Sequence, residues 1–237
     1  MPGSLEEGAA ADCRPSSVTL IGGVDEVGVG CLAGPCIVVC LILPVPMDIS
    51  RIAEVPKIKA WWPLEEVKDS KLTSEMERNA LHRRLVAWVS AIGGGVGVGE
   101  APVQMFNEHG HKYALDTATS DAVQAAIDDI GQRPRFLVVD GSVGVNGYPG
   151  LQRIEPKADK NYFVVAAASI LAKIIRDERM MELDRQFPQY GWRTSKGYPT
   201  QMHRRALQDH GLSEHHRQKA CGTVLRKHPP QRKPTGW

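Results

Sequence analysis

Two apolar segments, each followed at once by acidic residues and glycine, most constrain the fold of this chain. Residues 18–24 are rich in β-branched side chains and lead directly into Asp25, Glu26 and a glycine-containing turn. Residues 135–139 repeat this construction and lead into Asp140 and a glycine. Runs of this kind are typical of strands, and α/β sheets present their site residues at strand ends. The pattern predicts a sheet whose edge carries carboxylates.

The remaining periodicity predicts an α/β fold with a mixed central sheet flanked by helices. Residues 36–43 form the longest unbroken apolar run and predict a buried strand that ends before Pro44, and the glycine-rich residues 89–99 predict another strand. The expected helices cover residues 77–88, 112–130, 164–187 and 200–210. Thr73 or Ser74 is a candidate cap for the first of these helices, with Glu77 completing a capping box after Ser74.

The length of 237 residues suits one large domain with an appendage. We expect a loose terminus over residues 1–17, a main domain over 18–187, a helical C-terminal region over 188–225 and a basic tail over 226–237. Residues 44–68 are rich in proline and tryptophan and look like an insertion.

The charge of the chain is unevenly distributed. Residues 1–175 have a net charge of −5, whereas residues 176–237 have a net charge of +7, and no acidic residue follows Glu214. A basic C-terminal part suits a polyanionic partner such as nucleic acid. A solvated basic tail without a partner is the alternative for a charge run taken alone.

Composition excludes several classes of protein. No apolar run approaches the roughly 20 residues that a membrane helix needs, and the acidic N-terminus has no apolar segment typical of a secretory signal. The five cysteines show no CxxC pair and are expected to be reduced. We expect a cytoplasmic monomer that does not contact a membrane.

A further acidic candidate lies on the predicted helix over residues 164–187. Ser169, Lys173 and Asp177 are spaced four residues apart and share one face. With Asp25, Glu26 and Asp140, Asp177 makes four candidate carboxylates, whose mutual repulsion Mg²⁺ or Mn²⁺ would relieve. Two such ions about 3.5–4 Å apart form a clamp for phosphodiester hydrolysis.

The glycines after Glu26 also permit another interpretation. Gly28-x-Gly30-x-x-x-Gly34 is close to a dinucleotide-binding fingerprint, but its last spacing is one residue too long. Pro35 stands where a phosphate-binding helix should continue, and a proline there would break the helix. These two features disfavour a nucleotide-cofactor oxidoreductase.

The chain resembles bacterial-type ribonuclease HII in five motifs, which occur in the family's order between about residues 18 and 217. The motifs are GGVDEVGVGCLAGPCIVV, DSKLTSEMERNAL, FLVVDG, PKADKNYFVVAAASILAKIIRDERM and SKGYPTQMHRRALQDHGLSEHHR. The most specific part is AAASILAK followed by Arg-Asp.

This resemblance implies a ribonuclease H-like fold with a helical C-terminal extension. It implies an endonuclease that cuts the RNA strand of RNA/DNA hybrids, and duplex DNA 5′ to an embedded ribonucleotide, leaving a 3′-hydroxyl and a 5′-phosphate. Asp25, Glu26, Asp140 and Asp177 would be the ligands of two Mg²⁺ or Mn²⁺ ions. The implied substrate-binding residues are Gly28, Val29 and Gly30, Lys71, Lys157, Ser169, Lys173 and Tyr198.

Val29 departs from the family, whose turn is Gly-Arg-Gly. If the turn recognises the 2′-hydroxyl through its backbone, a valine is tolerated. If the missing guanidinium matters, binding weakens by roughly ten- to a hundredfold. Cleavage of long hybrids is therefore a safer prediction than efficient incision at one embedded ribonucleotide. The alternative is a catalytically weakened hybrid-binding module with altered recognition of the ribonucleotide junction.

Overall fold

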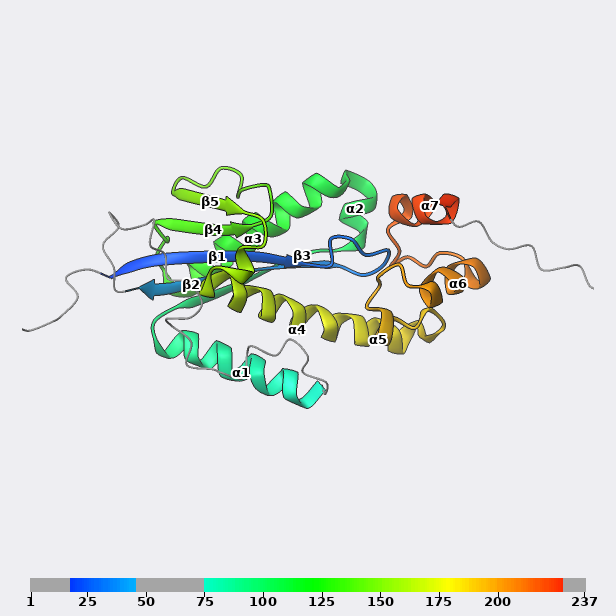
Figure 1. Cartoon of the computed structure of the whole chain (residues 1–237), viewed down its shortest axis with the longest axis horizontal. Coiled ribbons are helices and arrows are strands. Elements are labelled where there is room, and N and C mark those ends of the chain that lie inside the picture. The colour runs from blue at the N-terminus through cyan, green and yellow to red at the C-terminus, as the bar shows by residue number, and fades with distance from the viewer. Residues whose placement is uncertain (1–17, 46–74, 228–237) are drawn as a thin grey trace, which may run out of the picture.

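A five-stranded mixed sheet forms the centre of the molecule (Figure 1). The computed structural model describes residues 18–45 and 75–227. The strands are β1 (Thr19–Val27), β2 (Cys36–Val45), β3 (Gly95–Ala101), β4 (Phe136–Asp140) and β5 (Leu151–Glu155). They lie in the order β3-β2-β1-β4-β5; β1, β2 and β3 pair antiparallel, whereas β4 is parallel to β1 and β5 is parallel to β4.

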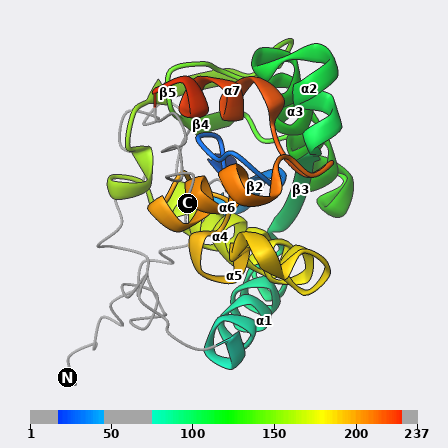
Figure 2. The same cartoon turned by 90° about the vertical axis from the view of Figure 1, so that its right-hand side faces the viewer.

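Helices cover both faces of the sheet, as Figure 2 shows from the end. One face carries α3 (His111–Ile130), which the short α2 (Val103–His109) precedes; the other carries α4 (Phe163–Gln186) and α1 (Glu75–Ala91). The C-terminal helices α5 (Trp192–Ser195), α6 (Gln201–His210) and α7 (Gln218–Lys227) lie at one end of the sheet. The fold expected from the sequence is confirmed.

Strand β2 is buried on both faces, which explains its unbroken apolar run. Ile37, Val39 and Leu41 enter the core between the sheet and α4. The alternate residues Val38, Cys40 and Ile42 enter the core between the sheet and α3. A central strand with helices on both sides has no polar face, so its sequence does not alternate.

Glycine in β3 and alanine in α3 allow the helix and the sheet to approach closely. A β-carbon on Gly97 would lie 2.0 Å from the Ala122 carbonyl oxygen, and one on Gly99 would lie 1.9 Å from the Ala118 carbonyl oxygen. Both distances are far inside van der Waals contact. Small residues on both elements are therefore a condition of this packing.

The C-terminal helices have a small core of their own and are joined to the segment between β1 and β2. Trp192, Tyr190 and Leu207 are buried together with Leu32 and Ala33. The Leu32 N–H donates to the Gly197 carbonyl at 2.8 Å. Thr200 caps α6, because its hydroxyl accepts the N–H of His203 at 3.2 Å.

The structure corrects several expectations about the elements. Residues 89–99 are not one strand: α1 continues to Ala91, and β3 begins only at Gly95, after Gly93 adopts a φ of +76°. Strand β5 and helices α2 and α7 are not marked by the sequence pattern and were not predicted as separate elements. Helix α7 extends to Lys227, so the proposed tail cannot begin at residue 226.

Some expectations lie outside the described residues. These are the loose terminus over 1–17, most of the insertion over 44–68, Lys71, the cap at Thr73 or Ser74, and residues 228–237. Within the described ranges, none of the helices combines the length and hydrophobicity needed to cross a bilayer. The described cysteines are free and buried.

Candidate active site

The carboxyl ends of β1 and β4 bring three of the predicted acids to one edge of the sheet. The two strands are adjacent and parallel, with Val24 in register with Val139. Asp25 and Glu26 lie near the carboxyl end of β1 and are therefore beside Asp140, the last residue of β4. Parallel strands present their carboxyl ends at the same edge, as the sequence pattern predicted.

Asp25 faces α4 and is 5% exposed. The pKa of its carboxyl is raised to about 6, chiefly by burial and also by the charges of Asp140 and Asp159, although a hydrogen bond with Ser169 acts to lower it. The backbone N–H of Glu26 also donates to Asp25 Oδ1 at 2.7 Å. Ser169, one of the predicted substrate-binding residues, is thus in direct contact with Asp25.

Glu26 faces the opposite side of the sheet edge, because successive side chains of a strand alternate. Burial, followed by the charges of Asp25 and Asp140, raises the pKa of Glu26 to about 7. The shift shows that the negative charges interact across the edge of the sheet. A cation bound among these oxygens would remove the repulsion.

Asp140 connects the strand end to the segment before α4. Its Oδ1 accepts the backbone N–H of Gly141 at 2.8 Å and that of Ala158 at 3.0 Å. Ala158 begins a short 3-10 turn that contains Asp159, and Lys157 precedes it with a φ of +65°. The hydrogen bond from Ala158 therefore holds this 3-10 turn, and Asp159 within it, close to Asp140 at the end of β4.

Asp159 is the functional candidate that the sequence reasoning missed. Its charge raises the pKa of Asp25, which places it in the same electrostatic group as the strand-end acids. Its sequence context is PKADK, in which Asp159 comes two residues after Lys157. It was overlooked because no strand or helical period marks this segment.

The structure does not group Asp177 with these acids. Asp177 lies eight residues beyond Ser169 on α4, about 12 Å along the helix axis. It is paired with Lys173 on the same helix and contributes a negative charge to the surroundings of Tyr198. Among the described acids, those that raise the pKa of Asp25 are Asp140 and Asp159.

The oxygen donors at this edge suit a hard divalent cation such as Mg²⁺ or Mn²⁺ in their chemistry. Their repulsion and raised pKa values indicate a site in which bound cations would be stabilising. In the described residues, no three acidic, histidine or cysteine side chains form a closed metal cage. The carboxylate oxygens therefore fit these ions in their chemistry, whereas the side chains do not converge on one point.

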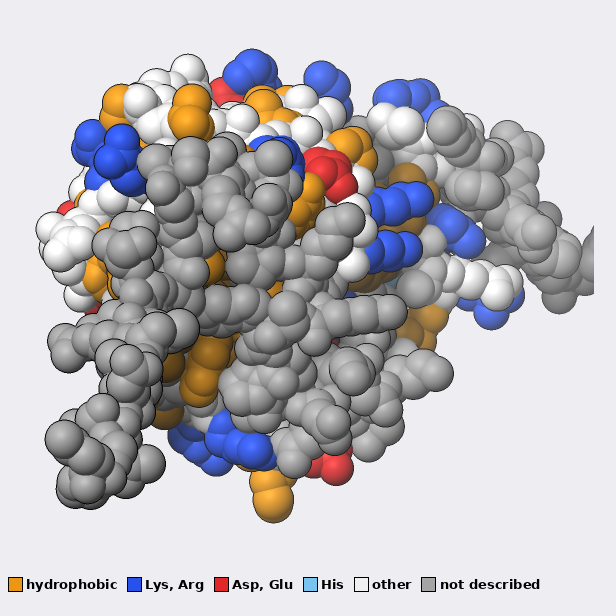
Figure 3. Space-filling model, turned by 60° about the vertical axis from the view of Figure 1, so that its left-hand side comes forward, with side chains coloured by type: hydrophobic (Ala, Val, Ile, Leu, Met, Phe, Trp, Pro, Cys, Tyr) orange, Lys and Arg blue, Asp and Glu red, His pale blue; other side chains and the backbone are white. Residues whose placement is uncertain are grey.

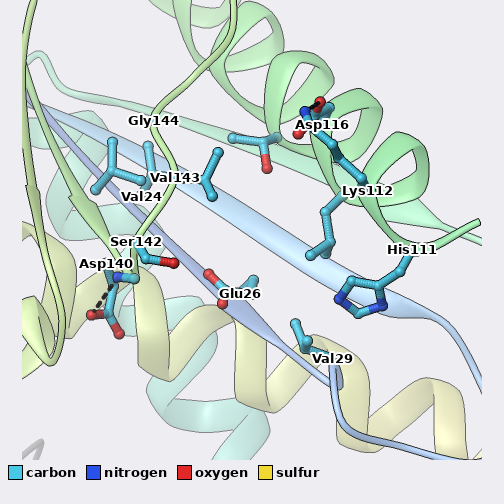
Figure 4. A pocket seen from close by; sticks show the side chains of 14 residues that line it. Val24, Glu26, Val29, His111, Lys112, Asp116, Asp140, Ser142, Val143 and Gly144 are labelled. Atoms are coloured by element: carbon cyan, nitrogen blue, oxygen red, sulfur yellow. Dashed lines mark hydrogen bonds and ion pairs between the residues drawn. The ribbon is translucent and has the colours of Figure 1, made fainter.

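A hollow of about 400 Å³ lies on the α3 side of the acidic edge (Figure 4). The Glu26 side chain lies between Asp140 and His111 in this view, and Ser142 and Val29 also line the hollow. His111 opens α3, and burial lowers its pKa. The hollow gives solvent and ligands access to two of the acids.

Tyr198 lies beside the turn that follows β1. Its ring is 41% exposed, and the Arg176 guanidinium carbon lies 5.7 Å from the ring centroid. The preceding Gly197 has a φ of +78°, and a β-carbon there would lie 2.3 Å from the Ala33 carbonyl oxygen. The glycine therefore permits the close contact that brings Tyr198 to the loop between β1 and β2.

The two glycines of the predicted turn serve different purposes. Gly28 has a φ of +101°, and a β-carbon there would lie 2.1 Å from Arg176 Nε. Gly30 is exposed, and no described atom lies within 4 Å of a β-carbon placed on it. Glycine is structurally required at 28, whereas at 30 it leaves open space beside the backbone.

Basic side chains accompany this end of the molecule. In Figure 3, several Lys and Arg side chains lie close together on the right-hand side of the view, and others are scattered over the rest of this face. The exposed ones in the C-terminal region include Arg193, Arg205, Lys219 and Arg226. Their positive charge suits a polyanion that runs past the acidic edge.

Comparisons with known proteins show the family to which this chain belongs. The family model described as Ribonuclease HII matches residues 22–223. A curated relative, Ribonuclease HII of Roseiflexus castenholzii, is 35% identical over 201 residues, which cover 83% of this chain and 80% of the relative.

Solved structures show the same fold. Ribonuclease H2 from Pyrococcus horikoshii superposes with a TM-score of 0.61 at 21% identity, covering 88% of this chain and 98% of that one. Bst-RNase HIII in complex with Mn²⁺ superposes with a TM-score of 0.53 at 18% identity, covering 88% of this chain and 71% of that one. At these identities the similarity concerns the fold alone.

Proposed function

The chain belongs to the ribonuclease HII family of nuclease hydrolases, and on that premise we propose that it hydrolyses the RNA strand of RNA/DNA hybrids. We further propose that it incises duplex DNA on the 5′ side of an embedded ribonucleotide, leaving a 3′-hydroxyl and a 5′-phosphate. Divalent cations, two in the active state, are the proposed cofactors.

The meeting of three acids at one edge of the sheet is the observation that carries this proposal, because β1 and β4 are parallel neighbours and Asp25 and Glu26 lie beside Asp140. Asp25 and Glu26 both have raised pKa values, and Asp140 contributes to both shifts. Carboxyl groups with raised pKa values that gather at one strand edge are typical of functional sites, and their repulsion costs stability. Cations held by these oxygens would offset the cost and serve the reaction.

We propose Asp25, Glu26, Asp140 and Asp159 as the residues that hold the cations. Asp159 replaces Asp177 in this set because its charge acts on Asp25. When bound, the ions would lower the pKa of the attacking water and stabilise the charge on the attacked phosphate. Ser169 fixes the orientation of Asp25, and the N–H groups of Gly141 and Ala158 fix that of Asp140.

Recognition of the substrate is assigned to the exposed groups beside the acids. Tyr198 offers its ring to the sugar next to the ribonucleotide, and the turn at Gly28, Val29 and Gly30 offers backbone N–H groups to the 2′-hydroxyl, which distinguishes RNA from DNA. Lys173 is exposed and pairs with Asp177, whose charge acts on Tyr198. Lys157 is exposed next to Asp159.

We assign different roles to the two parts of the chain that pack against each other. Residues 18–187 would supply the chemistry, and residues 188–227 would supply Tyr198 and the basic surface. The buried contacts of Leu32 and Ala33 with Trp192 and Leu207 join the two parts.

The first test uses two labelled duplexes, one a full RNA/DNA hybrid and one DNA with a single ribonucleotide. Each is incubated in Mg²⁺, in Mn²⁺ and in chelator, and the cut positions are mapped. We expect metal-dependent cuts in both, 5′ to a ribonucleotide. Cleavage of the hybrid alone would locate a loss of specificity at Val29. Binding without cleavage would favour the hybrid-binding module.

The second test distinguishes the two candidates for the fourth acid. Asp159→Asn should reduce kcat at least a hundredfold, as expected for loss of a group that stabilises the transition state. Asp177→Asn should retain most of kcat, and Asp128→Asn, which changes an exposed acid on α3, is the charge-matched control. Loss of kcat in Asp177→Asn with normal activity in Asp159→Asn would restore the assignment made from the sequence.

A further inference from the structure

Two buried arginines hold the loop between β1 and β2, which spans residues 28–35, by its carbonyl groups. Arg176 of α4 donates to the Pro35 carbonyl at 2.9 Å and to the Ala33 carbonyl at 3.3 Å. Arg217 donates to the Gly34 carbonyl at 2.9 Å and to the Val29 carbonyl at 2.8 Å. The two side chains are 0% and 4% exposed.

Arg217 reaches this loop from the C-terminal region. It stands directly before α7, and its own N–H donates to the Leu32 carbonyl at 2.8 Å. Its guanidinium carbon lies 3.8 Å from the centroid of the Phe106 ring, a distance typical of cation–π contact. Backbone and side chain therefore fix the position of Arg217 independently of any ligand.

The bond to Val29 sets the direction of the next peptide N–H. In a trans peptide the carbonyl and the N–H of one unit point in opposite directions. Because the Val29 carbonyl points at Arg217, the N–H of Gly30 points away from it. Among the described residues no acceptor faces the N–H groups of Val29 and Gly30, and Gly30 is exposed.

Arg176 restrains the same turn from its other side. Its Nε would lie 2.1 Å from a β-carbon on Gly28, so the glycine backbone lies directly against the guanidinium group. Arg176 Nη1 also donates to the Lys196 carbonyl at 2.9 Å, two residues before Tyr198. One side chain thus connects the turn to the segment that carries the tyrosine.

The two guanidinium groups also place positive charge next to the turn at Gly28, Val29 and Gly30, which has no charged side chain. Their hydrogen-bond acceptors are neutral carbonyls, and neither forms an ion pair with a described carboxylate. Arg217 therefore places a cation within hydrogen-bond distance of the backbone of Val29.

We propose that Arg217, assisted by Arg176, is a positioning residue that aims the free N–H of Gly30 at the 2′-hydroxyl of a bound ribonucleotide. The inference rests on the proposed function and extends it. It explains how the turn recognises a ribonucleotide although Val29 offers no side-chain donor. Arg217 acts through the Val29 carbonyl and does not itself touch the substrate.

The test measures the contribution of one 2′-hydroxyl to binding. Two fluorescein-labelled duplexes differ only in a single ribose or deoxyribose, and their Kd values are measured by anisotropy in Ca²⁺. In Arg217→Lys, an ammonium cannot donate in the planar fork that joins Gly34 and Val29. We expect the preference for the ribose duplex to fall about tenfold. Arg83→Lys on the exposed side of α1 is the control and should keep the full preference.

A purely structural role predicts a different result. If Arg217→Lys weakens binding of both duplexes equally, or leaves the preference unchanged, the inference is overturned. If Arg217→Lys does not fold, Phe106→Leu carries the same test, because it removes the ring on which Arg217 rests. A wild-type protein that neither prefers the ribose duplex nor cleaves it would instead reject the proposed function itself.

Discussion

Gly28 and Gly30 show how one residue type meets two different demands in a single turn. Gly28→Ala should destabilise the protein by about 2 kcal/mol or more, because the new β-carbon meets Arg176 at a positive φ. Gly30→Ala should change the free energy of unfolding by less than about 0.5 kcal/mol. Urea denaturation of both variants measures the difference. Equal destabilisation would show that the turn does not rest on Arg176.

At this scale the sequence predicted residues that a regular pattern marks. Asp25, Glu26 and Asp140 are predictable because they come directly after apolar runs of the sequence, and the pairing of β1 with β4 brings them together. Asp159 was missed because it lies in a short 3-10 turn whose position depends on a bond from Ala158 to Asp140. Helical spacing alone placed Asp177 on the same face as Ser169. It does not show that Asp177, two turns further along α4, lies too far along the helix to join the other acids.

Between elements, the closest approach is that of α3 to β3. Gly99→Ala should destabilise the protein by about 3 kcal/mol, because the β-carbon would lie 1.9 Å from the Ala118 carbonyl oxygen and the helix must move. The neighbouring Val98 is 41% exposed, so Val98→Ala should cost less than about 1 kcal/mol. Thermal unfolding of the two variants makes the comparison. A tolerated Gly99→Ala would mean that α3 can shift without loss of packing.

A histidine pair stabilises the C-terminal helices. The Tyr198 carbonyl can only accept, so His203 Nδ1 carries the proton that bonds to it at 3.0 Å. His203 Nε2 then accepts from Trp192 Nε1 at 3.0 Å and from His216 Nε2 at 3.1 Å. His216 Nδ1 in turn accepts the N–H of Ser213 at 2.9 Å. Every ring nitrogen is satisfied while both rings are neutral.

Acid should therefore loosen this region. Burial lowers the pKa of His203, and burial together with the charge of His203 lowers that of His216 to about 4. The unfolded chain binds protons near pH 6.5 whereas the folded one does not, so stability falls as the pH drops from about 6.5 towards 4. We expect His216 to account for a loss on the order of 2 kcal/mol.

The measurement compares pH profiles rather than single stabilities. His216→Gln cannot titrate, so its free energy of unfolding should fall less steeply below pH 6.5 than that of the wild type. The raised pKa values of Asp25 and Glu26 affect both proteins equally and cancel in the difference. Parallel profiles would show that His216 does not remain neutral in the folded protein.

At the scale of elements, the sequence predicted those with strong periods and missed those without them. Strand β5 was not expected because its burial is partial and it lies at the edge of the sheet, where an apolar pattern is not required. The strand predicted over residues 89–99 included the end of α1, since a buried helical turn and a buried strand are both short apolar runs.

Over the whole molecule, if the proposed function holds, the acidic edge and the basic C-terminal part together form one nucleic-acid-binding surface. Cations would neutralise the acids locally, while the arginines and lysines attract the phosphates that flank the reaction. Each neutralised phosphate releases counterions, so binding weakens with salt in proportion to the number of contacts. The uneven charge distribution of the sequence therefore predicts that binding of nucleic acid by the folded protein depends strongly on salt.

Removing residues 228–237 should reduce this salt dependence. The segment contains Arg232 and Lys233 and no acid, and each phosphate contact contributes about 0.9 to the slope of log K against log salt. Truncation after Lys227, where α7 ends, should lower the slope by at most about 2 and weaken binding at low salt. Removing residues 1–17, which carry more acidic than basic side chains, is the control and should not lower it. If the C-terminal truncation leaves the slope unchanged, the phosphate contacts lie on the described helices, and neutralising Arg205 and Lys219 should then reduce it instead.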